Sequence, residues 1–217
     1  MFFVAALLLA TTPIRSAEPT AAELAQSLQK KYDAIRDFSA DFAHTYKSGA
    51  LRKQLTEKGR LLIKKPGKMR WAYTSPEEKL FVSDGVKIYS YIPQDKQVIV
   101  STVPKDDTAS APALFLAGKG NLVRDFTASR VEAPAGSAPG TTALKLVPKT
   151  PQPDYDWLIL LVDSGSLGLR GLVSTDAQGG TSTFSFANLK ENVGLADKEF
   201  NFQMPRGVDV ITDAGQR

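Results

Sequence analysis

The most regular feature of the chain is an alternation of apolar and polar positions with a period of two. Between residues 68 and 74, Met69, Trp71 and Tyr73 alternate with basic, small or hydroxyl-bearing residues. Successive side chains of an extended strand point to opposite faces, so this pattern predicts a strand with one apolar face and one hydrated face. Turn signals on both sides of it predict antiparallel neighbours; they are Pro66-Gly67, Pro76 and Asp84-Gly85.

Short segments of the same kind recur along most of the chain, whereas helical periodicity is confined to two places. Thr20 and Glu23 form a capping box for a helix that reaches about Arg36, and residues 112–118 predict a short helix with proline at its start and glycine at its end. Strands that do not alternate with helices favour an open sheet or a barrel. The predicted strands are 37–46, 54–65, 68–74, 79–83, 86–92, 96–102, 142–148, 156–162, 168–174, 181–189, 198–203 and 207–211.

The length of the chain, its apolar start and its lack of cysteine bear on domain number and export. A chain of 217 residues suits one domain with a sizeable core. Its apolar start, residues 1–10, is too short to span a bilayer and is typical of a secretory signal, so we expect a signal peptide over 1–17 and a single domain over 18–217. Cysteine is absent, so the exported domain would be held together by its core and would lack the lipid-bearing cysteine of an anchored lipoprotein.

The charge and the candidate chemistry narrow the function further. The formal net charge is +4, but lysine and arginine are spread over many strands, so we expect no nucleic-acid partner; a weak attraction to anionic lipids or an acidic protein stays open. The single histidine, His44, has no nucleophile motif beside it and is expected to be a hydrogen-bonded structural side chain. The paired acidic residues lie in predicted loops. We therefore expect no catalysis, no metal and no cofactor.

Five segments, in this order, carry a family resemblance: Asp37–Phe42, the stretch from Lys65 to Trp71, Lys79–Gly85, Ala111–Ala117 and the closing residues 200–210. Together they resemble the periplasmic outer-membrane lipoprotein carrier family, the LolA-like proteins. The resemblance covers essentially the whole chain after residue 17. It implies a mainly β fold with some α, namely an unclosed antiparallel β-barrel with a lid of short helices.

The resemblance also implies a function. Relatives of this kind are soluble, monomeric periplasmic proteins that accept triacylated lipoproteins from an inner-membrane ABC-type release complex and deliver them to the outer membrane, to a lipoprotein acceptor where one exists. Burial of acyl chains is worth about 0.8 kcal/mol per CH₂, so such chains need an enclosure to cross water. The alternative is a periplasmic lipid- or lipoprotein-sensing regulatory protein of the same fold. The length favours the carrier, since such sensors normally carry a second domain.

Carried over to this chain, the resemblance implies three groups of site residues. We expect an acyl-chain-binding surface, a lid made by two helices, and a lid latch at Lys65, where well-known members of the family have arginine. Two plainer interpretations remain: the apolar residues form an ordinary solid core, and Lys65 is a solvated residue at the end of a strand. The expected acyl-chain-binding residues are Leu61, Ile63, Met69, Trp71, Tyr73, Phe81, Tyr89 and Tyr91, and the expected lid residues are Tyr32, Ile35, Leu114, Phe115 and Leu116.

Overall fold

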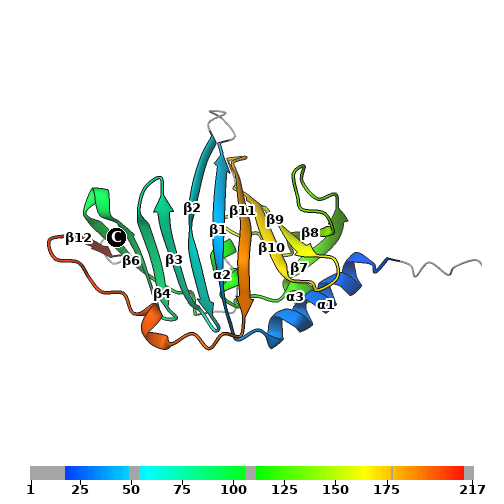
Figure 1. The fold of residues 1–217 in the computed structure, drawn as a ribbon, viewed down its shortest axis with the longest axis horizontal. Helices are drawn as coiled ribbons and strands as arrows, with labels where there is room; N and C mark the ends of the chain where they lie inside the picture. Colours follow the sequence, from blue (N-terminus) through cyan, green and yellow to red (C-terminus); the bar gives the residue numbers. More distant parts are fainter. Residues whose placement is uncertain (1–17, 49–53, 106–110, 177, 213–217) are drawn as a thin grey trace, which may run out of the picture.

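The computed structural model of the protein describes residues 18–48, 54–105, 111–176 and 178–212 (Figure 1). Within these residues, twelve strands form one curved sheet. Eleven of them lie within a few residues of a predicted strand. The strands are β1 Asp37–Lys47, β2 Gln54–Lys64, β3 Lys68–Ser75, β4 Lys79–Asp84, β5 Lys87–Ile92, β6 Gln97–Thr102, β7 Phe126–Val131, β8 Thr141–Pro148, β9 Trp157–Asp163, β10 Leu169–Thr175, β11 Thr181–Glu191 and β12 Asp209–Thr212.

The sheet is open. Its strand order is β12-β6-β5-β4-β3-β2-β1-β11-β10-β9-β8-β7, and the two end strands do not pair with each other. Neighbours run antiparallel, apart from β12, which lies parallel to β6. The chain runs outward from β1 to β6, crosses to the opposite edge of the sheet at β7 and winds back inward to β11, which pairs with β1. This arrangement confirms the predicted unclosed antiparallel barrel.

In the described part of the chain, three α-helices accompany the sheet: α1 (Ala21–Ala34), α2 (Pro112–Leu116) and α3 (Leu122–Asp125). The predicted capping box is present, because the Thr20 hydroxyl accepts from the Glu23 amide and the Glu23 carboxylate accepts from the Thr20 amide. The helix ends two residues before Arg36, since Ile35 is already extended. Figure 1 shows α2 behind the middle strands and α1 beside α3 and β7.

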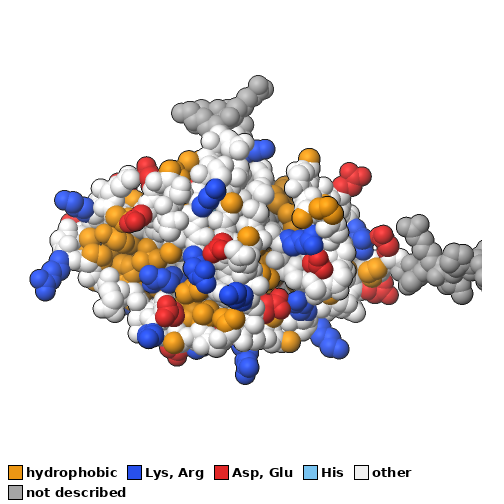
Figure 2. All heavy atoms as spheres, in the orientation of Figure 1, with side chains coloured by type: hydrophobic (Ala, Val, Ile, Leu, Met, Phe, Trp, Pro, Cys, Tyr) orange, Lys and Arg blue, Asp and Glu red, His pale blue; other side chains and the backbone are white. Residues whose placement is uncertain are grey.

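The main core lies between these helices and the face of the sheet toward them, which we call the inner face. The register of β2 and β3 pairs Leu61 with Trp71 and Ile63 with Met69, so the alternating apolar residues of both strands share this face. Leu61 and Ile63 are fully buried. The other side, the outer face, carries charged residues of both signs interspersed with apolar ones over the view in Figure 2.

One predicted strand is wrong. Residues 198–203 do not pair with the sheet; they begin with a short 3₁₀ helix, η2 (Asp197–Phe200), and continue as irregular chain. The alternation of Phe200 and Phe202 has another cause, namely packing on the sheet. η2 contacts β3 and β4 with Phe200 fully buried, and the Phe202 ring stacks on Tyr89 of β5 with ring centroids 4.9 Å apart. Phe200 and Phe202 therefore alternate because they pack on the sheet, although their segment forms no strand of it.

The strand β7 and the helix α3 were not predicted from the sequence. Among the six residues of β7 only Phe126 is buried, because this strand lies at the edge of the sheet. A single buried side chain leaves no period-two signal. The four-residue helix α3 is too short for a helical period, although Asn121 caps it by accepting from the amides of Val123 and Arg124.

Gly59 of β2 provides a test of the packing beneath the inner face. A Cβ atom at this position would collide with the Ala72 carbonyl oxygen and would lie 2.6 Å from Cζ of Phe42. We expect Gly59→Ala to lower the free energy of unfolding by about 1–3 kcal/mol, because overpacking displaces backbone or ring. Urea unfolding measures the loss. Gly165→Ala is the control, since a Cβ there meets only one atom, at 3.5 Å; equal losses in both variants would contradict the packing described here.

Candidate functional site: two lidded apolar hollows

Two apolar hollows lie between the inner face of the sheet and the helices. The first is narrow, with a volume of about 50 Å³, and the second has a volume of about 410 Å³. No residue lines both. Beneath the start of α2, the interior therefore departs from a solid core.

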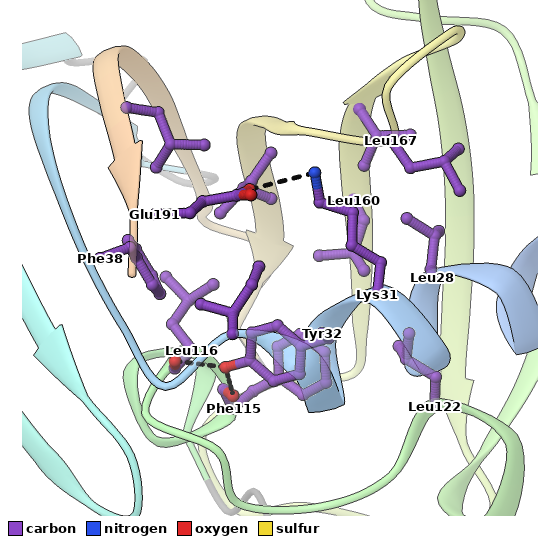
Figure 3. A pocket seen from close by; sticks show the side chains of 14 residues that line it. Leu28, Lys31, Tyr32, Phe38, Phe115, Leu116, Leu122, Leu160, Leu167 and Glu191 are labelled. Atoms are coloured by element: carbon purple, nitrogen blue, oxygen red, sulfur yellow. Dashed lines mark hydrogen bonds and ion pairs between the residues drawn. The ribbon is translucent and has the colours of Figure 1, made fainter. Parts of the chain in front are cut away.

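The first hollow lies beneath α1 (Figure 3). Lys31 lies at its edge and forms an ion pair with Glu191 of β11 at 3.2 Å. The remaining lining residues are all apolar or aromatic; they are Leu28 and Tyr32 from α1, Ile35 directly after it, Phe115 and Leu116 from α2, Leu122 from α3, and Phe38, Leu160, Val162, Leu167, Leu169 and Leu189 from the sheet and its turns.

The second hollow lies beneath the start of α2. One wall is aromatic and comes from consecutive antiparallel strands, and the facing wall includes Leu172 of β10 and Phe184 of β11. Polar side chains gather around it as well, among them His44, Ser174 and Asp176. The apolar lining consists of Met69, Trp71, Tyr73, Phe81, Ile88, Ala111, Pro112, Ala113, Leu172 and Phe184.

Most of the predicted site residues lie at these hollows. Of the predicted acyl-chain-binding residues, Met69, Trp71, Tyr73 and Phe81 line the second hollow. Of the predicted lid residues, Tyr32, Ile35, Phe115 and Leu116 line the first. Leu61, Ile63 and Leu114 belong to the buried core around the hollows and line neither of them. Contact with acyl chains remains a prediction for all of them.

Tyr89 and Tyr91 lie elsewhere, and their placement corrects the expectation. In the register of β4 and β5, Phe81 pairs with Ser90, whereas Tyr89 pairs with Val82 on the other face. Both tyrosine rings lie against Phe202 on the outer face, at centroid distances of 4.9 and 6.2 Å. The alternation within β5 was predicted correctly. The length of the turn after β4 decides which face of β5 points inward. The apolar pattern within β5 does not reveal this direction.

The far wall of both hollows was missed. It comes from β9, β10 and β11 and includes Leu160, Val162, Leu172, Phe184 and Leu189. These strands were predicted, but no site residue was assigned to them. A signal was present, since Leu158, Leu160 and Val162 alternate along β9. That signal is weak because the intervening residues are apolar too and pack in a second, smaller cluster on the other face.

Lys65, directly after β2, contacts α1 and the chain that follows α2. Its ammonium group donates to the Tyr32 carbonyl oxygen near the end of α1 and lies 3.8 Å from the centroid of the Tyr32 ring. Its side chain also passes Gly118 directly after α2, where a Cβ would come within 2.6 Å of Lys65 Cδ. Burial lowers the pKa of Lys65, while the Asp33 carboxylate opposes that effect. The side chain is not simply solvated.

Tyr32 joins the two helices to each other. Its hydroxyl donates to the Phe115 carbonyl oxygen at 2.8 Å and to that of Leu116, and its ring stacks on Phe115 with centroids 5.8 Å apart. Burial raises the pKa of the phenol, which keeps the hydroxyl protonated as a donor. The turn after β2 adds a further link, because the Gly67 amide donates to the Ala117 carbonyl oxygen at 2.8 Å. α1, α2 and β2 are thereby tied together.

His44 lies in a hydrogen-bonded cluster beside the second hollow, as expected for a structural histidine. Its Nδ1 is 3.4 Å from the Tyr73 hydroxyl and 3.5 Å from the Glu57 carboxylate, and its ring stacks on Phe184 at 4.1 Å between centroids. Glu57 is buried and is also paired with Lys79 at 2.6 Å. The cluster compensates for a buried carboxylate, because it supplies a cation and hydrogen bonds in one place.

This cluster predicts a pH dependence of stability. Burial lowers the pKa of His44 from 6.5, although Glu57 acts in the opposite direction. The unfolded chain therefore binds a proton at His44 more readily than the folded protein does. As a result, His44 leaves the free energy of unfolding unchanged above about pH 6.5 and lowers it as the pH drops below that value. We expect the free energy of unfolding to decrease from pH 7.5 to pH 5.5 by less in His44→Gln than in the unchanged protein. Urea titrations at both pH values measure this; identical slopes would contradict it.

Among the described residues, no helix has the length and apolar character needed to cross a membrane.

Comparisons with known proteins agree with this architecture. The family described as "Outer membrane lipoprotein carrier protein LolA" matches residues 33–203. Proteins named outer-membrane lipoprotein carrier protein include one from Methylococcus capsulatus that is 31% identical over 189 residues, covering 87% of this chain and 88% of the relative. Another, from Nitrosomonas europaea, is 29% identical over 215 residues and covers 98% of both chains.

A solved structure of similar fold is that of an uncharacterized conserved protein from Thermus thermophilus. It has a TM-score of 0.52 and 12% sequence identity, and the match covers 88% of this chain and 98% of the other. At this identity the likeness concerns the fold alone. The family match extends from the end of α1 through η2 and includes Lys65, α2 and all the residues that line the second hollow. This chain therefore belongs to the family of outer membrane lipoprotein carrier proteins, LolA.

Proposed function

We propose that this protein is a soluble periplasmic carrier that binds the acyl chains of lipoproteins released from the inner membrane and delivers them to the outer membrane. The observation that carries the proposal is the pair of apolar hollows under α1 and α2. The relatives named as lipoprotein carriers support it, since they match this chain over most of both lengths.

The hollows suit a cargo that must be hidden from water but not chemically changed. Apolar contact is non-directional, so a surface of leucine, phenylalanine and tryptophan accepts tails that differ in length and in the protein attached to them. Each buried methylene contributes about 0.8 kcal/mol, which is enough to hold a tail without any covalent step. The function is therefore binding and release, and catalysis and cofactors have no part in it.

Release requires a lid that moves. α1 and α2 are held over the hollows by buried apolar side chains, among them Leu28 and Leu116, and by hydrogen bonds around Tyr32 and Lys65. Opening must then be driven by cargo or by a partner with higher affinity for the open state. The partners in the proposal are triacylated lipoproteins, an inner-membrane ABC-type release complex and, where present, an outer-membrane acceptor.

The remaining parts of the proposal concern the ends of the chain. The signal peptide expected over residues 1–17 lies outside the described residues. We retain it as the means of export, with residues 18–217 acting as a single, monomeric carrier domain.

A binding experiment tests the function directly. A synthetic lipopeptide with three palmitoyl chains is mixed with the purified protein, and the complex is measured by native mass spectrometry and by displacement of a fluorescent apolar probe. We expect a one-to-one complex that displaces the probe. The control is the same peptide without acyl chains; equal binding of both peptides, or no complex with the acylated one, would refute the proposal.

A further inference from the structure

We propose that the indole N–H of Trp71 donates a hydrogen bond to a carbonyl group of the cargo, so that the second hollow prefers acyl chains to alkyl chains that lack a carbonyl. The inference rests on the carrier function proposed above. It assigns a specific donor to the second hollow and names the chemical group that this donor recognises, namely an uncharged ester or amide carbonyl.

The first argument is that Trp71 carries a buried donor without a partner. The residue lines the second hollow and is 4% exposed. Among the described residues, its Nε1 is the one buried side-chain nitrogen or oxygen atom that has no hydrogen-bond partner. Native proteins retain few such groups, because a buried donor left unpaired loses its hydration without compensation. An indole N–H can only donate, so the group that it lacks is an acceptor.

The second argument is that the neighbours of Trp71 offer no good acceptor. In the register of the sheet, Trp71 lies between Leu61 of β2 and Phe81 of β4. The rings of Phe42 and Phe184 pack against it edge-on, and each ring centroid lies 5.2 Å from that of the indole. A buried water molecule needs at least two polar partners, and these four side chains supply none. An acceptor for the indole is therefore expected to come with the ligand.

The third argument concerns charge and favours a neutral carbonyl over the carboxylate of a free fatty acid. Asp154 and Asp176 line the second hollow, whereas no lysine or arginine of the described residues does. Burial lowers the pKa of His44, so this imidazole is uncharged at pH 7 and supplies no positive charge. A fatty-acid anion would thus meet two carboxylates without a cation. An ester or amide carbonyl accepts a hydrogen bond without carrying a charge, and every acyl chain has one at its root.

The second hollow also has the size and the mixed lining that such a group requires. Its volume of about 410 Å³ lies within the range of roughly 300–1,000 Å³ that is usual for ligand sites. Opposite the aromatic wall, Ser174 and Ser182 are direct partners in the register of β10 and β11, and both line the hollow. Ser174 is 7% exposed. Hydroxyl groups on one wall and an indole on the other suit the polar root of an acyl chain better than a pure hydrocarbon.

The contact belongs to the loaded protein. The indole nitrogen is enclosed when the lid is closed, so it meets a carbonyl only when an entering chain moves the side chains around it. An unpaired donor raises the free energy of the empty state, and a donor paired with cargo does not. Trp71 therefore shifts the equilibrium toward loading.

The test changes one atom of the protein and one group of the ligand. The ligands are a lipopeptide with two palmitoyl esters and its counterpart with two hexadecyl ethers, which has tails of equal length but no ester carbonyl. The variant is Trp71→benzothienylalanine, in which sulfur replaces the N–H and the ring keeps its shape. We expect the unchanged protein to bind the ester about three- to tenfold more tightly than the ether, and the variant to bind both alike. Displacement of a fluorescent apolar probe measures the affinities.

The matched control is the same replacement at Trp157, the other tryptophan of the chain. Trp157 packs in the smaller cluster on the other face of the sheet and does not line the second hollow. The Trp157 variant should keep the full preference for the ester. A preference that survives in the Trp71 variant, or that disappears equally in both variants, would overturn the inference.

A second measurement leaves Trp71 unchanged and so does not depend on how a variant folds there. With two tryptophans, the ¹⁵N-labelled protein gives two indole N–H signals, and Trp157→Phe identifies that of Trp71. We expect the ester to move the Trp71 indole proton downfield and to slow its exchange with solvent, and the ether to do neither. If the rings of Phe42 and Phe184 already satisfy the N–H as weak acceptors, the two ligands will change the signal alike, and the inference is rejected.

The two proposals fail differently. If the unchanged protein binds neither lipopeptide, the carrier function falls and the carbonyl contact falls with it. If it binds the ester and the ether with equal affinity, the carrier function stands and only the contact at Trp71 is lost.

Discussion

Replacing Lys65 by leucine is expected to slow the transfer of a bound triacylated lipopeptide to acceptor vesicles about tenfold or more. The variant loses the ammonium group that donates to the Tyr32 carbonyl oxygen and lies over the Tyr32 ring. These contacts hold the lid in the closed position described above, so on the proposed function their loss makes the lid easier to open and the loaded state relatively more stable. A hydrogen bond to a charged group is worth about 1.5–3 kcal/mol, which sets the size of the effect.

The control for this variant is Lys68→Leu. It removes the same charge from a residue nearby in sequence, but Lys68 is paired with Asp197, whose side chain is 65% exposed, and it does not contact the lid. A Lys65→Arg variant retains the charge and should restore much of the normal rate. Transfer is followed by energy transfer between a labelled lipopeptide and labelled vesicles; an unchanged rate in Lys65→Leu, or equal slowing in Lys68→Leu, would exclude a latch.

Replacing Phe42 by alanine is expected to lower the free energy of unfolding by about 3–5 kcal/mol. The Phe42 ring is 4% exposed and lies against three others, with centroid distances of 4.8 Å to Tyr73, 5.2 Å to Trp71 and 6.2 Å to Phe184. Gly59 has no Cβ, and the Phe42 ring occupies the space where a Cβ would lie. Removing the Phe42 ring loses these contacts and opens a void beside Trp71, Tyr73 and Phe184, which line the second hollow.

The same substitution at Phe202 provides the comparison. That ring stacks on Tyr89 from outside the sheet and is only partly buried, so Phe202→Ala is expected to cost about 1 kcal/mol. Both values come from urea unfolding followed by circular dichroism. Similar losses in the two variants would mean that the inner face is not the principal core of the protein.

Much of the local structure could be predicted from the sequence. The alternation of Met69, Trp71 and Tyr73 correctly placed these residues on one face of a strand, and Thr20 with Glu23 marked the start of α1. These signals succeed because each depends on neighbours a few residues apart: the pleat alternates every two residues, and a capping box spans one helical turn. The family resemblance added the open barrel and its lid.

The inward or outward direction of each face depended on longer-range packing. Tyr89 and Tyr91 alternate as regularly as Trp71 and Tyr73, but Phe202, after η2, packs over them. The segment that carries Phe202 has the apolar alternation of a strand without forming one. The parallel pairing of β12 with β6 likewise joins residues far apart in the chain. A period of two is the same on both faces, so it cannot distinguish them.

The sequence by itself determined eleven of the twelve strands in the described residues, the first helix and the apolar residues available for the interior. Only the tertiary structure decided that this interior contains two hollows, that β9, β10 and β11 provide their far wall, and that Lys65 meets Tyr32. The physical reason is that a void is the space left when helices and strands distant in sequence fail to fill the volume between them. It depends on how these elements pack, and no local run of residues encodes it.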